Sequence, residues 1–320
     1  MDTELARTFL EIVTSGSFLS ASKRLHVTQS TVSLRVKRLE ELLGTPVFIR
    51  NKAGAELTPA GEQFERFARS MLKVWEEARY QVAVPEGFER SLIVGSQYSL
   101  WPKFSMRWLR LLERLMPDIA LRAEMGVPDG LIRMMLDGVL DIAVMYTPQL
   151  RPGLEVEVIM EDSLVLASSD PENGGGLDTD YIFIDWGPEF VQAHKTYFPD
   201  FRASHVTLSL GTLSARYVIE HQRSAYFPAR FIEDEVEEGT LHVVRDAPVF
   251  PFPVYAVWHS ESDTELVERA LTTLRRVAGR VEEDQAELLE EAGVEPVSMA
   301  PRLVDIIEDT DQVPTGSVPG

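Results

Sequence analysis

Serine, lysine and arginine side chains recur at helical spacing over residues 29–43, and together they could recognise DNA. At about 100° per residue, apolar residues at steps of four, three and four form one stripe of the expected helix. The other side then presents small polar groups, which suit base edges in the major groove, and cations, which neutralise phosphates. This outer face consists of Ser30, Ser33, Leu34, Lys37 and Arg38.

The local sequence predicts that this helix is the second of a pair joined by a tight turn. Ser17 is suited to cap a first helix over residues 18–25. Thr28 is suited to cap the second helix, and Gly44 is suited to end it. The outer face alone does not decide between DNA binding and an ordinary helical hairpin with a solvated face.

Both flanks of the pair favour a winged DNA-binding domain. An amphipathic segment over residues 5–13 can close a three-helix core, and residues 47–58 predict two short strands around a turn. The succession of a TQSTVS helix, L-E-E-L-L-G, V-F-x-R and L-T-P-A-G resembles the amino-terminal domain of LysR-type transcriptional regulators. The resemblance is close over roughly the first 80 residues and looser beyond them.

The resemblance implies roles for individual residues of the winged domain. The residues expected at DNA are Thr28, Gln29, Ser30, Thr31, Ser33, Leu34, Arg35, Lys37, Arg38, Arg50 and Lys52. Among these, the residues implied to approach bases are Gln29, Ser30 and Ser33, and those implied to hold phosphates are Lys37, Arg38 and Arg50.

Two departures from the family pattern accompany this set. The family often has arginine at the place of Leu34. In this sequence the arginine is the next residue, Arg35, which is expected on a flank of the helix. The family wing is often richer in arginine, and Glu56 should repel phosphate. Both departures suggest an altered sequence preference or weaker non-specific binding rather than a loss of DNA binding.

The net charge of −20 opposes DNA binding only when it is averaged over the chain. Residues 15–52 hold seven basic residues against two acidic ones, whereas residues 282–320 hold eleven acidic residues against one basic. Exposed charges are largely screened beyond about 10 Å, so the local basic patch decides phosphate contact.

The composition also bounds the class of protein. A chain of 320 residues predicts two or three domains. No apolar run approaches about 18 residues, and the amino terminus lacks a secretory pattern, so we expect a cytoplasmic protein without membrane contact. The absence of cysteine excludes disulfides and thiolate metal sites, and nothing in the sequence calls for a cofactor.

A long helix is expected to follow the wing. Thr58 before Pro59 is a helix start signal. Apolar residues then repeat in alternating steps of four and three, which predicts a dimerisation helix rather than the alternative of a helix packed on its own domain. This seam consists of Ala60, Phe64, Phe67, Met71, Val74 and Ala78.

From residue 91 the chain alternates predicted strands and helices, which indicates a parallel sheet with helices on both sides. Residues 155–169 predict two strands of this series. The LysR resemblance implies a two-lobed α/β effector domain, similar to periplasmic binding proteins.

The expected fold class is therefore a multidomain α+β protein with a winged helix-turn-helix, a long linker helix and the two-lobed domain. The expected units are residues 1–58 for DNA binding, 59–87 for the linker helix and hinge, 88–281 for effector binding and 282–320 for an acidic, disordered tail. Within the effector domain, the first lobe is expected at about 91–163 plus 261–281 and the second at about 164–260.

A ligand of such a domain should lie beyond the carboxyl ends of the strands, between the lobes. Arg223, which stands where the family has a glycine-rich turn, could bring a cation there for a carboxylate, the alternative being a surface arginine. We expect a small effector that is partly apolar or aromatic. The candidate ligand residues are Ser96, Gln97, Tyr98, Ser99, Val127, Met145, Tyr146, Trp186, Thr212 and Arg223.

Two other classes of protein compete with a regulator. An enzyme is disfavoured because the sequence contains no G-x-S-x-G elbow, no phosphate-binding P-loop and no H-E-x-x-H helix. A protein-binding adaptor without DNA is disfavoured because Leu34 is the only apolar anchor on the outer helix face. The expected partners are double-stranded DNA, a small-molecule effector and a second copy of the chain in a homodimer or homotetramer, with RNA polymerase as a further partner to consider.

Overall fold

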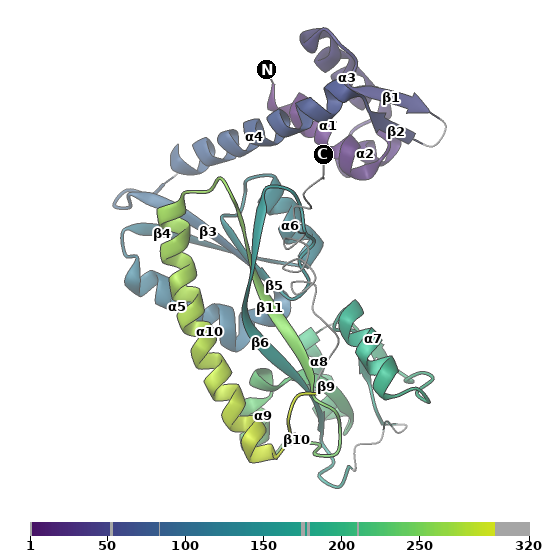
Figure 1. Ribbon diagram of the computed structural model, residues 1–320, viewed down its shortest axis with the longest axis vertical. Coiled ribbons are helices and arrows are strands. Elements are labelled where there is room, and N and C mark those ends of the chain that lie inside the picture. Colours follow the sequence, from purple (N-terminus) through teal and green to yellow (C-terminus); the bar gives the residue numbers. More distant parts are fainter. Residues whose placement is uncertain are drawn as a thin grey trace, which may run out of the picture.

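The computed structural model describes residues 2–51, 54–82, 84–173, 177, 180–209 and 211–297. Its amino-terminal part is a three-helix domain with a two-stranded wing, as the sequence predicted (Figure 1). No helix among the described residues is long and apolar enough to cross a membrane. The elements of the winged domain are α1 (Thr3–Ser15), α2 (Phe18–Arg24), α3 (Gln29–Leu43), β1 (Phe48–Asn51) and β2 (Gly54–Leu57).

The predicted caps of the helix pair are confirmed. Ser17 Oγ accepts a hydrogen bond from the Ser20 amide, and Thr28 Oγ1 accepts one from the Thr31 amide at 3.2 Å. Gly44 ends α3 with a φ of 72°, a backbone conformation that glycine adopts without strain. These caps fix where the turn lies, and therefore which residues of α3 face outward.

Helix α4 (Pro59–Val82) leaves the winged domain and presents two apolar faces. Phe64, Ala68 and Leu72 are buried in the core of the winged domain, where the ring of Phe64 packs edge-on against Phe9 at 5.0 Å. Phe67 is 63% exposed on the other side. The residues of the expected seam are therefore split between two faces. Phe64 belongs to the domain's own core, because it lies in one row of the helix with Ala68 and Leu72, at steps of four, and this row faces the core.

The carboxy-terminal part is built on one seven-stranded sheet in the order β10–β6–β11–β5–β3–β4, with β9 also paired to β6. β3 pairs in parallel with β4 and β5, whereas every other pair in this sheet is antiparallel, so the expectation of a parallel sheet was wrong for the rest of it. The strands are β3 (Arg90–Gln97), β4 (Ile119–Gly126), β5 (Ile142–Met145), β6 (Leu154–Ser168), β9 (Ser224–Pro228), β10 (His242–Val243) and β11 (Phe250–His259).

A single long strand joins the two halves of this part. β6 runs unbroken where two strands were expected, because it pairs with β11 along most of its length. The first lobe contains β3, β4, β5 and two helices, α5 (Met106–Leu115) and α6 (Pro128–Leu136). The second lobe contains β9, β10, β7 (Phe183–Ile184), α7 (Pro188–Tyr197), β8 (Thr207–Leu208), η3 (Gly211–Leu213), α8 (Ser214–Glu220), η4 (Ala229–Phe231) and α9 (Glu233–Glu237).

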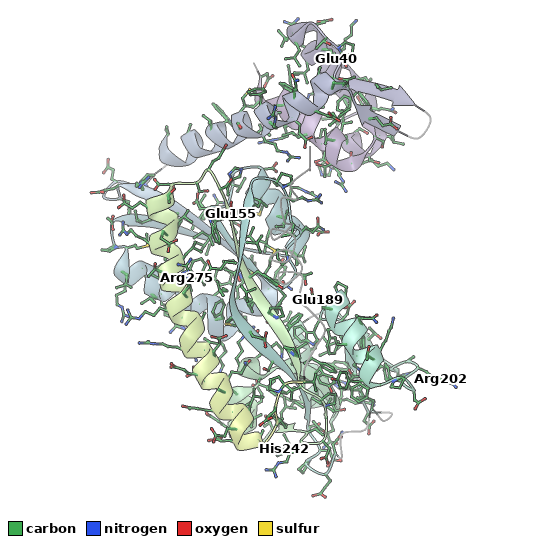
Figure 2. The ribbon with its side chains drawn as sticks, in the orientation of Figure 1. Glu40, Glu155, Glu189, Arg202, His242 and Arg275 are labelled. Atoms are coloured by element: carbon green, nitrogen blue, oxygen red, sulfur yellow. The ribbon has the colours of Figure 1, made fainter. Side chains whose placement is uncertain are left out.

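Helices cover both faces of the sheet in the first lobe. Alternate residues of β3 explain this, since Leu92 and Val94 face the large core under α5 while Ile93 faces the small core under α6. Figure 2 labels Arg275 beside the sheet, where its guanidinium binds both carboxylate oxygens of Glu157 on β6 at 2.8 and 2.7 Å.

The last helix is much longer than expected. α10 (Thr264–Ala292) runs along both lobes, and its final turns bury Gln285, Leu288 and Leu289 (Figure 1). Val297 then donates its amide to the Val249 carbonyl at 2.8 Å. A disordered tail beginning at residue 282 was therefore wrong for residues 282–297, because the apolar stripe continues through this acidic stretch. The rest of that tail, residues 298–320, lies outside the described residues.

Candidate functional site

The outer face of α3 carries the groups that the sequence proposed for DNA. Gln29, Ser30, Lys37 and Arg38 are exposed, and Leu34 is 67% exposed. On the opposite side the apolar stripe is buried, with Val32, Val36 and Leu39 in the core. Ser33 and Thr31 lie between the two faces and are half-buried. Thr28 has a structural task as the helix cap, and its hydroxyl also contacts those of Ser30 and Thr31 at 2.8 Å.

Arg35 does not share this face. Its guanidinium binds the Glu4 carboxylate, and it also donates to Thr8 Oγ1 at 3.3 Å. One residue beyond Leu34, the helix has turned by about 100°, which directs Arg35 to α1. The expectation of Arg35 at DNA is corrected accordingly: the structure gives it the role of joining α3 to α1.

The wing is held against the helices by backbone contacts. The Ala55 amide donates to the Gly16 carbonyl at 2.9 Å, and Glu40, labelled in Figure 2, accepts from the Val47 amide at 3.0 Å. Arg50 lies on β1 opposite Ala55, whereas Lys52 lies outside the described residues.

A second candidate site lies where the two lobes meet. Gly211, at the start of η3, has a φ of 54° and lies close to the first lobe. A Cβ atom added to Gly211 would lie 3.5 Å from Ser99 Cβ and 3.7 Å from the Trp186 ring. Ser214 lies two residues after Thr212 of η3. Its hydroxyl is buried without a hydrogen-bond partner among the described residues. The structure thus brings Ser99, Trp186 and η3 together, as proposed for the ligand.

Exposed apolar side chains lie at the strand ends next to this junction. Tyr98 and Val127 directly follow Gln97 and Gly126, which are paired across β3 and β4. Both side chains are 57% exposed, and Leu213 of η3 is 76% exposed. η3 contacts the short helix η1 (Tyr98–Leu100), so these three side chains lie around one region of the surface.

Several other predicted ligand residues are already engaged within the protein. Ser96 Oγ pairs with Ser105 Oγ at 2.7 Å in the core, and Gln97 Oε1 accepts from the Tyr146 amide at 3.1 Å. Met145 is fully buried under α6, and the Trp186 indole donates to the Tyr226 carbonyl at 2.8 Å. These residues shape the junction rather than present free polar groups to it.

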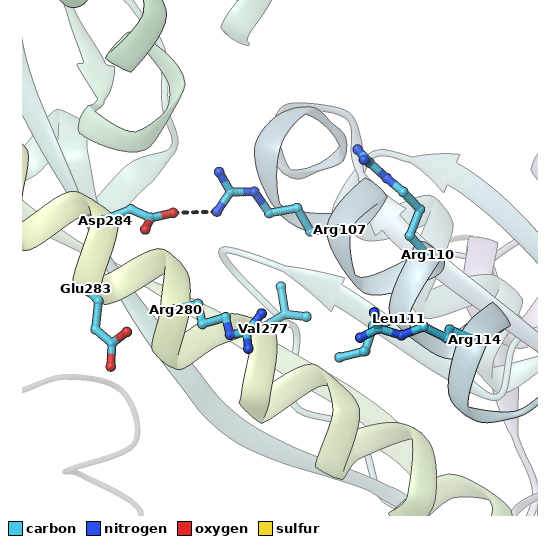
Figure 3. Close-up of a pocket in the computed structure, with 8 residues that line it drawn as sticks. All are labelled: Arg107, Arg110, Leu111, Arg114, Val277, Arg280, Glu283 and Asp284. Atoms are coloured by element: carbon cyan, nitrogen blue, oxygen red, sulfur yellow. Dashed lines mark hydrogen bonds and ion pairs between the residues drawn. The ribbon is translucent and has the colours of Figure 1, made fainter.

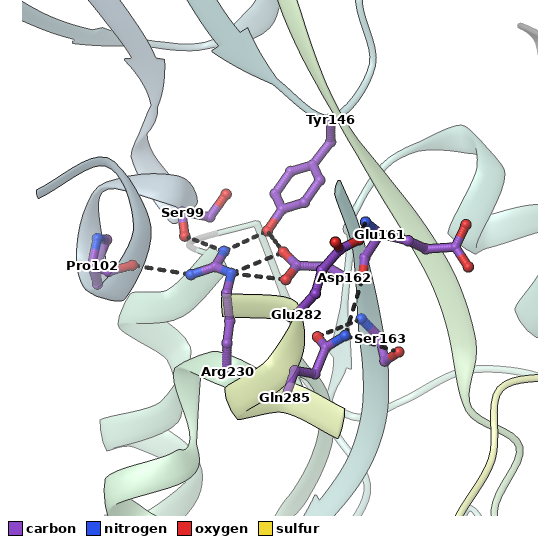
Figure 4. Close-up of polar contacts among 9 residues, drawn as sticks. All are labelled: Ser99, Pro102, Tyr146, Glu161, Asp162, Ser163, Arg230, Glu282 and Gln285. Atoms are coloured by element: carbon purple, nitrogen blue, oxygen red, sulfur yellow. Dashed lines mark hydrogen bonds and ion pairs between the residues drawn. The ribbon is translucent and has the colours of Figure 1, made fainter. Parts of the chain in front are cut away.

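The sequence reading missed the charged centre of the junction, Arg230 (Figure 4). Its Nε donates to both oxygens of Asp162 at 2.9 and 3.0 Å, and Nη2 donates to Tyr146 Oη at 2.7 Å. Nη2 also donates to the Ser99 carbonyl at 3.1 Å, and Nη1 donates to the Pro102 carbonyl at 3.0 Å. Arg230 lies two residues past Pro228, the carboxyl end of β9, so the strand-end rule, applied to that strand as well, would have found it.

Burial decides the charge states of this network. Desolvation raises the pKa of the Tyr146 phenol well above its ordinary range, so the phenol keeps its proton, which it donates to Asp162 at 2.6 Å. Although burial favours the neutral form of Arg230, the Asp162 carboxylate raises the pKa of Arg230. The network is therefore a buried ion pair in which four of the five guanidinium N–H groups are bonded to acceptors within the protein.

The expectation that Arg223 lies in the cleft was wrong. Arg223 precedes β9 at the end opposite Arg230, and its Nη1 donates to Asp180 at 2.7 Å. Because β9 is antiparallel to β6, the turn before it lies at the far end of the second lobe from the junction. No group of three or more metal-ligating side chains is found in the part of the chain that the structure describes.

Known protein families match both the amino-terminal part and the first lobe of the carboxy-terminal part of the chain. Residues 3–62 match the family described as bacterial regulatory helix-turn-helix protein, lysR family, and residues 85–172 match the LysR substrate binding domain. The HTH-type transcriptional regulator HdfR of Yersinia enterocolitica is 29% identical over 283 residues, which are 85% of this chain and 95% of that protein.

Two solved structures share the fold. Full-length OxyR from Pseudomonas aeruginosa superposes with a TM-score of 0.53 at 23% identity, over 87% of this chain and 97% of that one. Vibrio fischeri DarR in complex with DNA gives a TM-score of 0.52 at 17% identity, over 87% and 99%. With both of its domains matched in their order along the chain, the protein belongs to the LysR family of bacterial transcriptional regulators.

Proposed function

We propose that this regulator binds a specific operator through α3 as a homodimer, or as a tetramer of two dimers, and that a small effector at the lobe junction modulates the binding. The observation that carries the proposal is the division of α3 into two faces. Val32, Val36 and Leu39 hold the helix in place from behind, while its polar and basic side chains are exposed. The exposed face has the chemistry of major-groove recognition.

Base contacts and phosphate contacts are assigned to different residues of this face. Gln29, Ser30 and Ser33 lie in the first turns of α3, where helix-turn-helix proteins read base edges. Lys37 and Arg38 lie further along and are proposed to hold phosphates. Arg38 is only loosely engaged by Glu41, at 3.4 Å and with both side chains exposed, so DNA can displace that contact.

The exposed side of α4 is proposed to join two copies of the chain. Phe67 and Val74 are 63% and 62% exposed, and Trp75 is 48% exposed, on one side of a single helix. Pairing this side with its counterpart would remove the apolar surface from water and place two α3 helices on one DNA. A regulator bound at a promoter in this way would also meet RNA polymerase.

The junction chemistry favours an effector that is small, partly apolar or aromatic, and not dependent on a cation. Tyr98, Val127 and Leu213 supply exposed apolar surface, and Ser214 supplies a buried hydroxyl without a partner among the described residues. Arg223, the cation expected to hold a carboxylate, is bonded to Asp180 at the far end of the second lobe and supplies no cation to the junction. An effector changes DNA binding only if it binds one arrangement of the lobes or dimers better than another.

Substitutions in α3 test the DNA part. Ser33→Ala and Gln29→Ala should change which bases are preferred in a selected operator, by about 1–3 kcal/mol at the affected position. Lys37→Ala should weaken binding to all sequences by a similar factor. If both classes of variant bind the operator as the unaltered protein does, α3 is not the recognition helix.

Calorimetry tests the effector part. Small aromatic and apolar molecules that stabilise the protein in a thermal-shift screen should lose binding in Leu213→Asp, which places a charge on the apolar surface. They should keep binding in Arg223→Ala, which alters the far end of the second lobe. Ligands that respond to Arg223 and not to Leu213 would contradict the proposed site.

Leu34 is the observation that favours a second candidate, a protein-interaction adaptor. It is 67% exposed at the centre of the outer face of α3 and could anchor a partner helix. Leu34→Ala should then abolish partner binding, whereas in the DNA-binding proposal it changes operator preference and leaves the salt dependence intact.

A further inference from the structure

An arginine-rich groove of about 570 Å³ lies between α5 and α10, away from both sites described above (Figure 3). Leu111 and Val277 line its floor, and charged side chains of both helices line its sides. Its size is within the range of sites that bind ligands or peptide segments. The groove is lined by Arg107, Arg110, Leu111, Arg114, Val277, Arg280, Glu283 and Asp284.

The arginines of α5 face the groove because of their spacing. Arg107, Arg110 and Arg114 follow one another at steps of three and four, which places them on one side of the helix. Arg280 faces them from α10. Four cations against Glu283 and Asp284 leave this groove positive.

Three of these four arginines have no ion-pair partner among the described residues. Arg107 binds Asp284 at 2.5 Å, whereas Arg110, Arg114 and Arg280 form no ion pair with any described residue. Guanidinium groups held side by side repel one another, so an anionic occupant would stabilise the groove.

The chain's own carboxy-terminal segment has the matching chemistry. Residues 305–311, Asp-Ile-Ile-Glu-Asp-Thr-Asp, carry four carboxylates, and their two isoleucines suit the apolar floor. Carboxylates bind guanidinium groups in bidentate fashion, with more geometric specificity than a lysine ammonium offers.

The segment can reach the groove. Residues 298–304 can span ~23 Å when extended. They follow Val297, which is bonded to Val249, the residue before the strand position paired with Leu164. Gln285, next to the groove residue Asp284, accepts from the amide of Ser163, the neighbour of Leu164, so the segment starts close to this end of the groove. Because the two are tethered in one chain, the effective concentration of the segment at the groove is on the order of millimolar.

We propose that the groove between α5 and α10 binds the acidic segment 305–311 of the same chain. The bound carboxylates neutralise Arg110, Arg114 and Arg280. The segment thereby prevents this basic surface from attracting other anions, nucleic-acid phosphates included. The inference does not depend on α3 or on an effector.

Disulfide formation between two introduced cysteines tests the docking in the full-length chain. The chain has no cysteine of its own, so Glu113→Cys beside the groove and Thr310→Cys in the segment form a defined pair. Docking predicts at least tenfold faster closure of the intramolecular disulfide than in two charge variants, Arg110→Gln/Arg114→Gln and Glu308→Gln/Asp309→Asn. Arg276→Gln is the matched control, since Arg276 is exposed on α10 but does not line the groove.

The products distinguish the possible occupants. Equal rates in the parent pair, in both charge variants and in the control would overturn the proposal. A product of dimer mass that forms in place of the monomeric ring would assign the groove to the segment of a second copy. If the arginine variant lost non-specific duplex binding while the disulfide rate stayed constant, the groove would be a nucleic-acid surface. Both of these results also contradict docking within one chain.

Discussion

Arg230 donates from Nε to both carboxylate oxygens of Asp162, at 2.9 and 3.0 Å, in the interior between the two lobes. Arg230 belongs to the second lobe, through η4, whereas Asp162 lies on the strand that runs through both. The same guanidinium holds the carbonyls of Ser99 and Pro102 of the first lobe. One buried side chain thus joins three segments that are far apart in the sequence.

Removal of this cation should be costly. In Arg230→Met the Asp162 carboxylate stays buried without its counter-charge, so the free energy of unfolding should fall by about 3–5 kcal/mol in urea denaturation. Arg230→Met/Asp162→Leu should recover part of the loss. The exposed pair Arg216–Glu220 is the control, and Arg216→Met should leave the urea midpoint nearly unchanged. A midpoint as little affected in Arg230→Met would contradict a stabilising role for the buried ion pair.

Two neighbouring cations of α3 should behave differently in DNA binding. Lys37→Ala removes an exposed cation from the outer face, so the slope of log K against log salt concentration should become shallower by about 0.9. Arg35→Ala removes a cation that is already bound to Glu4, so the slope should stay unchanged. Equal changes in both variants would place Arg35 at the phosphates after all.

The apolar side of α4 should control the oligomeric state. Phe67→Glu places a charge in the proposed seam and should raise the dimer dissociation constant at least ~30-fold, the effect of about 2 kcal/mol. Sedimentation measures this directly. Leu150→Glu is the control, since Leu150 is 47% exposed in the effector half. A dimer that survives Phe67→Glu and not Leu150→Glu would place the interface elsewhere.

His194 should make the second lobe sensitive to acid. It is buried among aromatic rings beside Tyr181, and desolvation lowers its pKa to about 4. An unfolded histidine has a pKa of about 6.5, so the unfolded state binds more protons between these values and stability falls as the pH falls. At pH 5 the expected loss is ~2 kcal/mol relative to neutral pH.

The matched variant for this prediction is His194→Gln, which can keep a hydrogen bond to Tyr181. Its melting temperature should fall less between pH 7.5 and pH 5 than that of the unaltered protein. If both fall by the same amount, other groups carry the acid sensitivity.

Local signals in the sequence predicted the winged domain well, because short-range chemistry determines it. The cap at Thr28, the turn at Gly44 and the stripe through Val32 each act within a few residues. They were sufficient to give both ends of α3 and its outward face.

Long-range contacts determine what the sequence did not predict. β6 is one strand because β11 pairs with it across both lobes, and no local pattern records that pairing. The extension of α10 was visible in the spacing of Val281, Gln285 and Leu288, but the acidic composition pointed to disorder. Arg223 was expected at the junction and Arg230 was missed, because which end of β9 meets the first lobe depends on its antiparallel pairing with β6.

The most direct test of operator recognition is selection of operator sequences from a random duplex library, followed by a salt titration on the selected DNA. We expect the folded, dimeric protein to enrich a site with two-fold related halves. It should bind that site at least a thousandfold more tightly than scrambled DNA, with an affinity that falls steeply as salt rises. Failure of the same sample to enrich any sequence, even at low salt, would contradict operator recognition by α3.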